Sequence, residues 1–323
     1  MSYLLASIFS LFQMQNVDLP QEALSSLESF YEQVSPKSLQ ITKLPRFTNR
    51  VYLLNDTVNC YVFRIPGIGT STFIPRGSEY QNSLEAYRFQ FTPAQVLFFD
   101  PKTGIQISSY IEDFVTLKFE ELYQKEMIQK IARLLKGIHS SEMGFENKIR
   151  LLHRSKILQD VIPQEIFSDI KGYFDVKDAL QEIEICLDSS VFQWVPCHGD
   201  PVPSNFLSIA GKMMLFDWEY SGLCDPALDL AHLSCIMGYS SEVDQWMLTC
   251  YGRGRLLEEK MHIFKPLVEF WLATWGIFQI TLQKSPSQNN FFHQYAVSRI
   301  RKCQKYMASS EFQDSLKKIK NEK

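Results

Sequence analysis

The chain has 323 residues, of which 45% are hydrophobic and 21% are charged, and its formal net charge is -3. This composition is typical of a globular protein and excludes disorder over most of the length. The slight acidity offers no electrostatic surface for nucleic acid, so we expect no nucleic-acid partner, and no protein partner is evident.

Seven cysteines without C-x-x-C pairs, and without histidines at zinc spacing, favour free thiols in a reduced, cytoplasmic setting. Two apolar runs, at residues 3–14 and 270–280, are each too short to span a bilayer. No basic residue precedes the first run, so we expect an N-terminal helix packed on the protein rather than a secretion signal. We therefore predict no membrane span.

In chain order, a helix is predicted to begin near Pro20 and to end before Pro36. Runs of β-forming residues then predict strands, the second and third joined by a turn at Asn55 and Asp56. A polar helix and two further strands follow. Five strands with one inserted helix predict a small antiparallel lobe. The predicted strands are 39–44, 50–54, 58–65, 95–99 and 105–110, and the inserted helix is 76–88.

From residue 114 the pattern is mainly helical. Apolar residues at spacings of three and four predict a buried helical face that ends at His139. A short hairpin turned at Gly211 is predicted from strands 205–209 and 213–216, and the basic tail at 317–323 is expected to fray. A further helical region is predicted over 164–187, and the remaining predicted helices are 227–237, 241–251, 257–282 and 288–308.

The most informative stretch lies in the second half of the chain. The pattern H-x-D-x-x-x-x-N places His198, Asp200 and Asn205 in one loop, and Asp217 and Glu219 follow a short apolar run. Phosphoryl transfer needs a carboxylate that orients and deprotonates the attacking hydroxyl, and an amide with a carboxylate to hold Mg²⁺. The order of these groups predicts a phosphotransferase. The alternative, a solvated acidic loop, is disfavoured by the apolar residues on either side.

Four motifs in this order resemble the choline/ethanolamine kinase family, and most closely the bacterial choline kinases of the aminoglycoside-phosphotransferase-like superfamily. The resemblance implies an α+β, two-lobed protein-kinase-like fold with ATP and Mg²⁺ as cofactors. We expect a small antiparallel β lobe that binds the nucleotide over residues 1–112. A larger, mainly helical lobe with the catalytic loop and substrate pocket is expected over residues 113–323. The motifs are residues 62–70, 74–79, 198–205 and 216–231.

The resemblance also assigns roles in the loop. Asp200 would be the base that accepts the proton of the substrate hydroxyl. Asn205 and Asp217 would bind Mg²⁺, and Glu219 would assist with a second ion, because hard oxygen ligands suit this metal.

Three further residues near this loop are expected to be structural. His198 would hold the loop by hydrogen bonds rather than take part in the reaction. Asp229 is expected to secure the same loop, and Asp225 is best explained as a helix N-cap.

Arg64 would take the place of the phosphate-binding lysine found in most kinases, since a guanidinium grips phosphate oxygens with two parallel hydrogen bonds. Glu79 would pair with it from the inserted helix. The alternative is a surface ion pair, which would contribute little energy.

Thr48 and Asn49 match the phosphate-binding turn of the family, but the glycine that normally precedes them is missing. Glycine allows a close approach of the backbone to the phosphates. We therefore expect a looser nucleotide clamp, in which Arg46 or Arg50 compensates by charge.

A quaternary ammonium group is bound by the faces of aromatic rings, because it offers no hydrogen bonds. Trp275 and Tyr295 fall where the family places such rings, although leucine replaces the tryptophan usual one turn earlier. For each single ring, packing in the core is an equal alternative. The candidate substrate-binding residues are Tyr220, Trp271, Trp275, Phe292 and Tyr295.

We therefore expect ATP- and Mg²⁺-dependent phosphorylation of a small amino alcohol, with choline as the first candidate. One alternative is another kinase of the superfamily, acting on ethanolamine, thiamine, a sugar or an aminoglycoside. An aminoglycoside pocket would be lined by carboxylates, whereas segment 270–296 is mainly aromatic. A second alternative is a catalytically weak kinase fold that serves as a binding module. The missing glycine supports this reading, and the intact set of Asp200, Asn205 and Asp217 opposes it.

Overall fold

The structure is a computed structural model that describes residues 19–34, 39–44, 48–56, 58–187, 192–252, 254–283 and 285–322. The chain divides into two compact units, Met1–Phe114 and Val115–Lys323. The helix expected at residues 3–14 lies outside the described residues, as does Arg46.

The first unit contains a five-stranded antiparallel sheet in the order β1-β2-β3-β5-β4. Every predicted strand is confirmed to within two residues at each end, because a run of β-forming residues bounded by turn residues is a local signal. The hairpin turn between the second and third strands is confirmed too, since the Asp56 carboxylate accepts from the backbone N–H groups of Val58 and Asn59. The strands are β1 (Gln40–Leu44), β2 (Arg50–Asn55), β3 (Cys60–Ile65), β4 (Val96–Phe99) and β5 (Gln106–Ser109).

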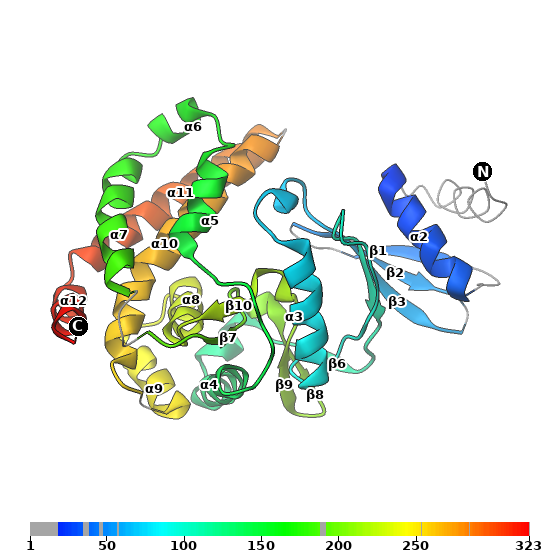
Figure 1. Cartoon of the computed structure of the whole chain (residues 1–323), viewed down its shortest axis with the longest axis horizontal. Helices are drawn as coiled ribbons and strands as arrows, with labels where there is room; N and C mark the ends of the chain where they lie inside the picture. Colours follow the sequence, from blue (N-terminus) through cyan, green and yellow to red (C-terminus); the bar gives the residue numbers. More distant parts are fainter. Residues whose placement is uncertain are drawn as a thin grey trace. The chain divides into compact units, whose positions relative to one another are not determined.

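Helix α2 (Gln21–Val34) covers one face of this sheet (Figure 1). Its Leu27 packs in one core with Phe63 and Ile65 of β3. Because successive side chains of a strand point to opposite faces, Arg64 points away from α2. The arginine is thereby directed to the face of the sheet that α2 leaves uncovered.

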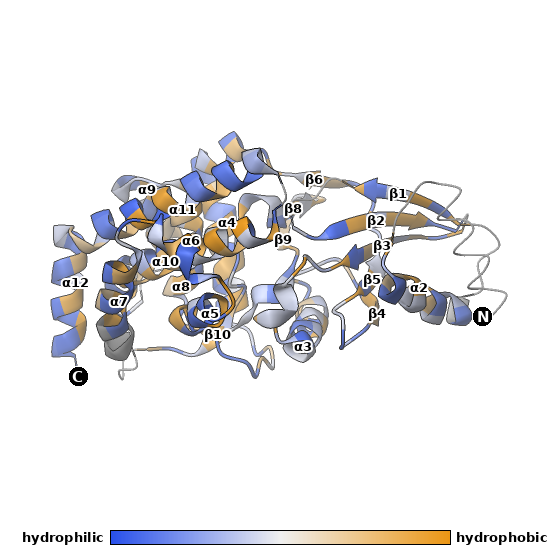
Figure 2. Ribbon diagram, turned by 90° about the horizontal axis from the view of Figure 1, so that it is seen from above, coloured by the Kyte–Doolittle hydropathy of each residue, from blue (hydrophilic) through white to orange (hydrophobic). Residues whose placement is uncertain are grey.

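Helix α3 (Arg76–Arg88) begins and ends where the sequence predicts, and the ring of its Tyr80 stacks on Phe99 of β4 with centroids 5.0 Å apart. The helix carries few hydrophobic residues, and Figure 2 shows it mostly in white and blue. Its buried positions include Arg76, Glu79 and Asn82. This face of the helix therefore depends on hydrogen bonds rather than on apolar packing.

The second unit is mainly helical, and α10 is its central element. This helix packs against α5, α8, α11 and α12 and is buried along most of its length. No helix in the described part of the chain is both long and apolar enough to cross a membrane. The helices are α4 (Lys125–His139), α5 (Leu151–Gln159), α6 (Gln164–Ser168), α7 (Tyr173–Leu187), α8 (Ala227–Met237), α9 (Ser241–Tyr251), α10 (Leu257–Leu282), α11 (Pro286–Met307) and α12 (Ser310–Asn321).

Short strands hold the central loop of this unit. The predicted hairpin turned at Gly211 is confirmed as β8 (Phe206–Ile209) and β9 (Lys212–Leu215). Strand β7 (Val195–Cys197) pairs with β10 (Gly222–Cys224), and β6 (Phe114–Thr116) lies beside β8. The sequence pattern does not predict these three, because a strand of three residues is too short to show alternation.

One prediction for the second unit is wrong. The helical region over 164–187 is confirmed and consists of two helices, α6 and α7, with Gly172, whose φ of 83° suits glycine, directly before α7. The basic tail is not frayed up to Asn321, because α12 continues to that residue. Its N-terminus is capped by Ser309, and Ile319 is fully buried.

No pattern in the sequence predicts helix α5. Its buried side carries Arg154 and Ser155 beside leucines, so the apolar residues alone do not follow a helical period. Polar residues on the buried side of a short helix indicate a structural or functional task. Arg154 has such a task in the candidate site.

Candidate active site

The central loop begins at the end of β7, where His198 is fully buried. Its Nε2 lies 2.8 Å from the carbonyl oxygen of Phe216, and its Nδ1 lies 3.3 Å from the backbone nitrogen of Asp200. A carbonyl only accepts and an amide N–H only donates, so Nε2 carries the hydrogen and Nδ1 accepts. Burial lowers the pKa of His198, which keeps the ring neutral. The histidine is structural, as predicted.

Asp229 of α8 secures this loop, which confirms the role predicted for it. Its Oδ2 accepts from the backbone N–H of His198 at 2.7 Å, and its Oδ1 from that of Gly199 at 2.8 Å. Burial by itself would raise the pKa of Asp229, but His139 and the loop amides outweigh it and lower the pKa. The loop is therefore held by an ionised carboxylate.

Asp200 is a partly buried carboxylate directly after this anchored segment. The Nδ2 of Asn205 donates to the carbonyl oxygen of Asp200 at 3.0 Å and to its Oδ2 at 3.3 Å. Burial, and then the negative charge of Asp217, raise the pKa of Asp200 to about 7. A carboxyl group with this pKa can take up a proton near neutral pH, as a general base must.

Asn205 directly precedes β8 and Asp217 lies just after β9, and the pairing of these two strands brings the two residues together. Asn205 closes the short helix η3 (Pro203–Asn205), and its carbonyl oxygen accepts from the N–H of Phe216 at 2.9 Å. Asp217 has φ 63° and ψ 72°, a left-handed conformation that is uncommon outside glycine and is often found at functional sites. Glu219, two residues on, is 7% exposed.

In the first unit, ion pairs and a hydrogen bond join four polar residues. Arg64 of β3 pairs with Glu79 of α3, and Glu79 also pairs with Arg76 at 2.7 Å. Arg76 in turn donates to Oγ1 of Thr70. The side chains of Arg64 and Glu79 are only 11% and 2% exposed, so the pair is buried and the surface alternative is wrong.

Gly67 extends this series to the turn at Thr48 and Asn49. Oγ1 of Thr70 donates to the carbonyl oxygen of Gly67 at 2.7 Å, and the N–H of Gly67 donates to Oδ1 of Asn49 at 2.9 Å. A Cβ at Gly67 would lie 3.1 Å from the carbonyl oxygen of Thr48. The turn at Thr48 and Asn49 has no glycine of its own, but Gly67 from the neighbouring loop approaches it closely. The sequence pattern does not predict this contact.

The five aromatic candidates lie in the second unit and differ in exposure. Trp271 and Phe292 are buried, whereas Tyr220, Trp275 and Tyr295 are partly exposed. The ring contacts are edge-on, between Tyr220 and Trp271 at 6.2 Å and between Trp275 and both Phe292 and Tyr295 at 5.9 and 6.2 Å. Trp271 and Trp275 are four residues apart on α10, so they share one face of that helix.

Residues 42–251 match the family model described as choline/ethanolamine kinase. The chain belongs to the choline/ethanolamine kinase family. The resemblance found in the sequence is therefore confirmed, together with the two-lobed α+β kinase-like fold. This family consists of ATP-dependent phosphotransferases that act on an alcohol group.

Individual relatives and solved structures are consistent with this family. The chain is 27% identical over 240 residues to protein LicA of Haemophilus influenzae, and the match covers 69% of this chain and 66%, just under two thirds, of that protein. The solved choline kinase LicA from Streptococcus pneumoniae has a TM-score of 0.72 at 26% identity, covering 85% of this chain and 99% of that one. A LicA structure in complex with AMP has a TM-score of 0.75 at 26% identity, covering 87% and 96% of the two chains.

This member of the family has a buried arginine behind its loop. Arg154 of α5 is 7% exposed, and its Nη2 donates to the carbonyl oxygen of Tyr220 at 2.9 Å. Its positive charge lowers the pKa of Asp200, against the larger effect of burial. No sequence signal distinguishes this arginine from those on the surface, since the contact joins residues 66 positions apart.

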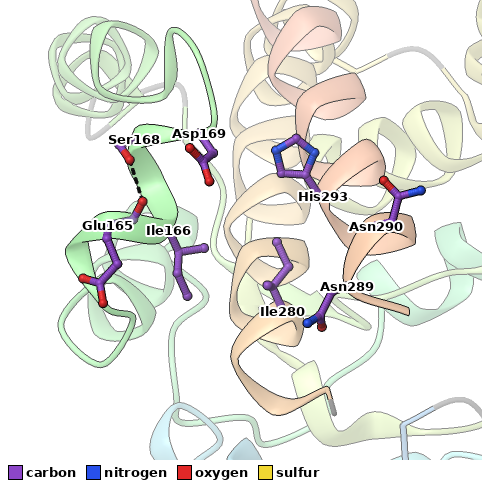
Figure 3. A pocket seen from close by; sticks show the side chains of 8 residues that line it. All are labelled: Glu165, Ile166, Ser168, Asp169, Ile280, Asn289, Asn290 and His293. Atoms are coloured by element: carbon purple, nitrogen blue, oxygen red, sulfur yellow. Dashed lines mark hydrogen bonds between the residues drawn. The ribbon is translucent and has the colours of Figure 1, made fainter. Parts of the chain in front are cut away.

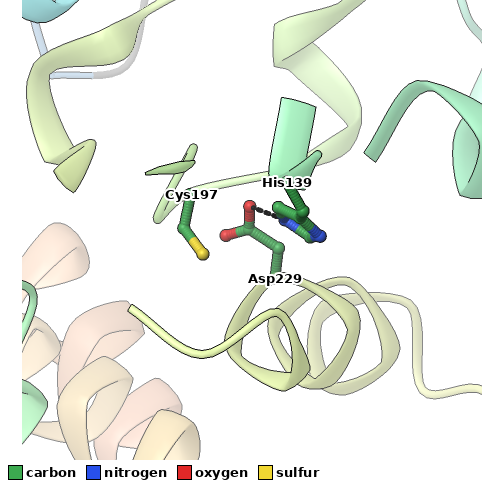
Figure 4. Close-up of side chains that lie close together, drawn as sticks. All are labelled: His139, Cys197 and Asp229. Carbon is green, nitrogen blue, oxygen red and sulfur yellow. Dashed lines mark hydrogen bonds and ion pairs between the residues drawn. The ribbon is translucent and has the colours of Figure 1, made fainter. Parts of the chain in front are cut away.

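His139, Cys197 and Asp229 each offer one atom to a common point, all within 4.8 Å of one another (Figure 4). A metal would require Cys197 as thiolate, but burial, and then Asp229, raise the pKa of this thiol well above its ordinary value. Both oxygens of Asp229 already accept from loop amides, and Nδ1 of His139 lies 2.9 Å from the hydroxyl of Tyr251. These side chains act as a hydrogen-bonded anchor.

A cavity of about 530 Å³ lies between α6 and the pair α10–α11 (Figure 3). Carboxylates line the side of α6, and amides and an imidazole line the side of α11. None of the predicted site residues contributes to it. Its lining is Glu165, Ile166, Ser168, Asp169, Ile280, Asn289, Asn290 and His293.

Proposed function

We propose that this protein is a Mg²⁺-dependent kinase that transfers the γ-phosphoryl group of ATP to the hydroxyl of a small amino alcohol, with choline as the first candidate. The observation that carries the proposal is the joint placement of Asp200, Asn205 and Asp217 around one anchored loop in a member of this family. Phosphoryl transfer is catalysed mainly by positioning and electrostatics, and these three side chains supply both.

Asp200 would accept the proton of the substrate hydroxyl as that oxygen attacks the γ-phosphorus. Two features support this role. The carboxylate remains partly exposed, with 26% of the side chain accessible, so a substrate can reach it. Burial and the charge of Asp217 raise the pKa of Asp200 to about 7, which suits a base at neutral pH.

Asn205 and Asp217 would hold Mg²⁺, with Glu219 near a second ion. The donor set fits, because these are the oxygen ligands that Mg²⁺ prefers. The Nδ2 of Asn205 is used on Asp200, which leaves Oδ1 to face a cation. Besides burial, the negative charge of Asp217 raises the pKa of Asp200, and a bound cation would offset this repulsion. When bound, Mg²⁺ neutralises charge on the phosphates.

Arg64, Glu79, Thr48 and Asn49 would bind the nucleotide. Glu79 holds the guanidinium of Arg64 in place, and the N–H of Gly67 donates to the side chain of Asn49. The charged side chain of Arg64 and the polar side chain of Asn49 are therefore both positioned before a nucleotide binds. The complex of the relative LicA with AMP supports a nucleotide as ligand.

The acceptor site would use the partly exposed rings Tyr220, Trp275 and Tyr295, with Trp271 and Phe292 supporting them from the core. Aromatic faces attract a quaternary ammonium group. The name choline kinase carried by the relative from Streptococcus pneumoniae favours choline over ethanolamine, thiamine or an aminoglycoside.

A panel of acceptors tests the proposal. ADP release from Mg-ATP is measured with choline, ethanolamine, thiamine and an aminoglycoside, and we expect choline to give the highest kcat/KM. Turnover of a different acceptor alone would overturn the substrate assignment. Absence of turnover with every acceptor, in protein that binds Mg-ATP, would favour a binding module.

The base is tested by Asp200→Ala, which we expect to abolish turnover nearly completely while the protein stays folded. Asp160→Asn, at a 63% exposed side chain beyond α5, is the matched control and should keep full activity. Substantial residual turnover in Asp200→Ala would show that another group is the base.

A further inference from the structure

His232 lies on α8, three residues after Asp229, and is 1% exposed. Its Nδ1 is 3.1 Å from the carbonyl oxygen of Gly199. A carbonyl oxygen only accepts, so Nδ1 carries the hydrogen. Burial lowers the pKa of His232 to about 4, so the ring is neutral at physiological pH. Its Nε2 therefore presents a lone pair and no hydrogen.

This lone pair faces the candidate catalytic base. Nε2 of His232 lies 3.6 Å from Oδ1 of Asp200 and has no hydrogen-bond partner in the described part of the chain. Two acceptors cannot bond to each other without a proton between them, and 3.6 Å is too long for a hydrogen bond.

The two oxygens of Asp200 consequently differ. Oδ2 accepts from Nδ2 of Asn205 at 3.3 Å. No donor among the described residues contacts Oδ1, whose buried neighbour is the lone pair of His232. A carboxylate oxygen without a donor keeps its full basicity, whereas one that already accepts hydrogen bonds is a weaker base.

The surrounding backbone keeps this arrangement in place. Asp229 and His232 lie on one face of α8, and together they bind the N–H groups of His198 and Gly199 and the carbonyl oxygen of Gly199. Gly199 has φ 80°, and a Cβ there would overlap the carbonyl oxygen of Tyr220. The peptide that precedes Asp200 is thus fixed on both sides.

We propose that Oδ1 of Asp200 is the oxygen that takes the proton from the acceptor hydroxyl, and that His232 is a positioning residue that keeps Oδ1 free of protein donors. The inference rests on the proposed function and names the reacting atom within it. In the step, the hydroxyl O–H bond breaks and an O–H bond forms on Oδ1. The hydroxyl oxygen bonds to the γ-phosphorus, and the bond from that phosphorus to the bridging oxygen of ADP breaks.

After this proton transfer, the contact between Oδ1 of Asp200 and Nε2 of His232 changes from repulsive to attractive. Once Oδ1 carries the proton, it becomes a donor, and Nε2 of His232 is the acceptor that faces it. The pair must close by a few tenths of an ångström, as contacts at catalytic groups do when substrate binds. His232 thereby favours the state in which the proton has left the substrate.

The tautomer of His232 is the first test, and it requires no substrate. The chain has six histidines, so ¹⁵N-histidine spectra are simple, and His232→Asn identifies the signals that belong to His232. We expect a protonated Nδ1 and an unprotonated Nε2 at about pH 7. A hydrogen on Nε2, in the other tautomer or in the imidazolium, would place a donor on Oδ1 and overturn the proposal. This result is readable even if the proposed function fails.

A pair of variants supplies the second test. In His232→Asn, Nδ2 takes the place of Nδ1 and keeps the bond to Gly199, while nothing reaches Oδ1. In His232→Gln, the amide reaches the place of Nε2 and can donate to Oδ1. We expect both to lower kcat, with the Gln variant about tenfold or more below the Asn variant at similar KM for the acceptor. A Gln variant as active as the Asn variant, with both folded by circular dichroism, would contradict the proposal.

Discussion

Nη2 of Arg154 donates to the carbonyl oxygen of Tyr220 at 2.9 Å, and a Cβ added to Gly199, which immediately precedes Asp200, would overlap the same oxygen. Helix α5, which no pattern in the sequence predicts, thus supports the segment that precedes Asp200 through one backbone oxygen. Two predictions concern this contact.

Gly199→Ala should abolish most of the activity and destabilise the protein. The added Cβ would overlap backbone, which cannot move aside as a flexible side chain can, and the positive φ is unfavourable for alanine. Thermal unfolding and turnover are both measured. Gly211→Ala is the control for φ alone, since Gly211 also has positive φ but open space around it. Equal behaviour of the two variants would show that the contact with Tyr220 is unimportant.

Arg154→Met should lower activity more than it lowers stability. The apolar side chain fills similar space and removes a buried charge that costs free energy, but it also frees the Tyr220 carbonyl and removes a positive charge near Asp200. We expect kcat to fall about tenfold or more, with partial recovery in Arg154→Lys. Unchanged kcat in the Met variant would exclude this role.

Glu79→Gln should weaken ATP binding. Glu79 pairs with both Arg64 and Arg76, so the neutral amide removes a negative charge that both guanidinium groups face. We expect KM for ATP to rise about tenfold, while KM for the acceptor stays the same. Glu85→Gln on the same helix, whose partner Arg88 is exposed, is the control and should be neutral.

Lys260→Met should destabilise the second unit by about 3–5 kcal/mol, because it removes the cation that faces the buried carboxylate of Asp225. Nζ of Lys260 lies 2.7 Å from Oδ2 of Asp225, and the two side chains are 2% and 0% exposed. Asp225 also accepts from the N–H of Ala227, the first residue of α8, which agrees with its predicted capping role. Urea unfolding measures the loss. The double variant with Asp225→Asn should recover part of it, and strict additivity would contradict a direct pair.

Stability should fall as the pH drops from about 6.5 to about 4, partly because of His232. Burial lowers its pKa to about 4 in the folded protein, so in this window the unfolded chain binds a proton that the folded chain does not. The contribution is up to about 3 kcal/mol, and it is absent above the ordinary histidine pKa. Unfolding of the wild type and of His232→Asn across this range isolates it. Parallel curves for the two proteins would assign the loss to other groups.

The sequence by itself determined the elements whose signal is local. Runs of β-forming residues marked the five strands of the first unit, a three-and-four spacing marked α4, and motif order marked the loop from His198 to Asp217. It identified the acidic and amide side chains of the candidate site, because their types and spacing reflect the chemistry of phosphoryl transfer.

Only the tertiary structure decided which polar groups share a buried environment. Arg154 meets Tyr220 across 66 positions, and His232 meets Gly199 across 33. Neither pair has a periodic signal, because the partners belong to different elements that meet only when the core forms. The same reason explains α12, whose basic tail is held by the burial of Ile319. Local spacing records secondary structure and chemistry, whereas burial depends on contacts that the whole fold creates.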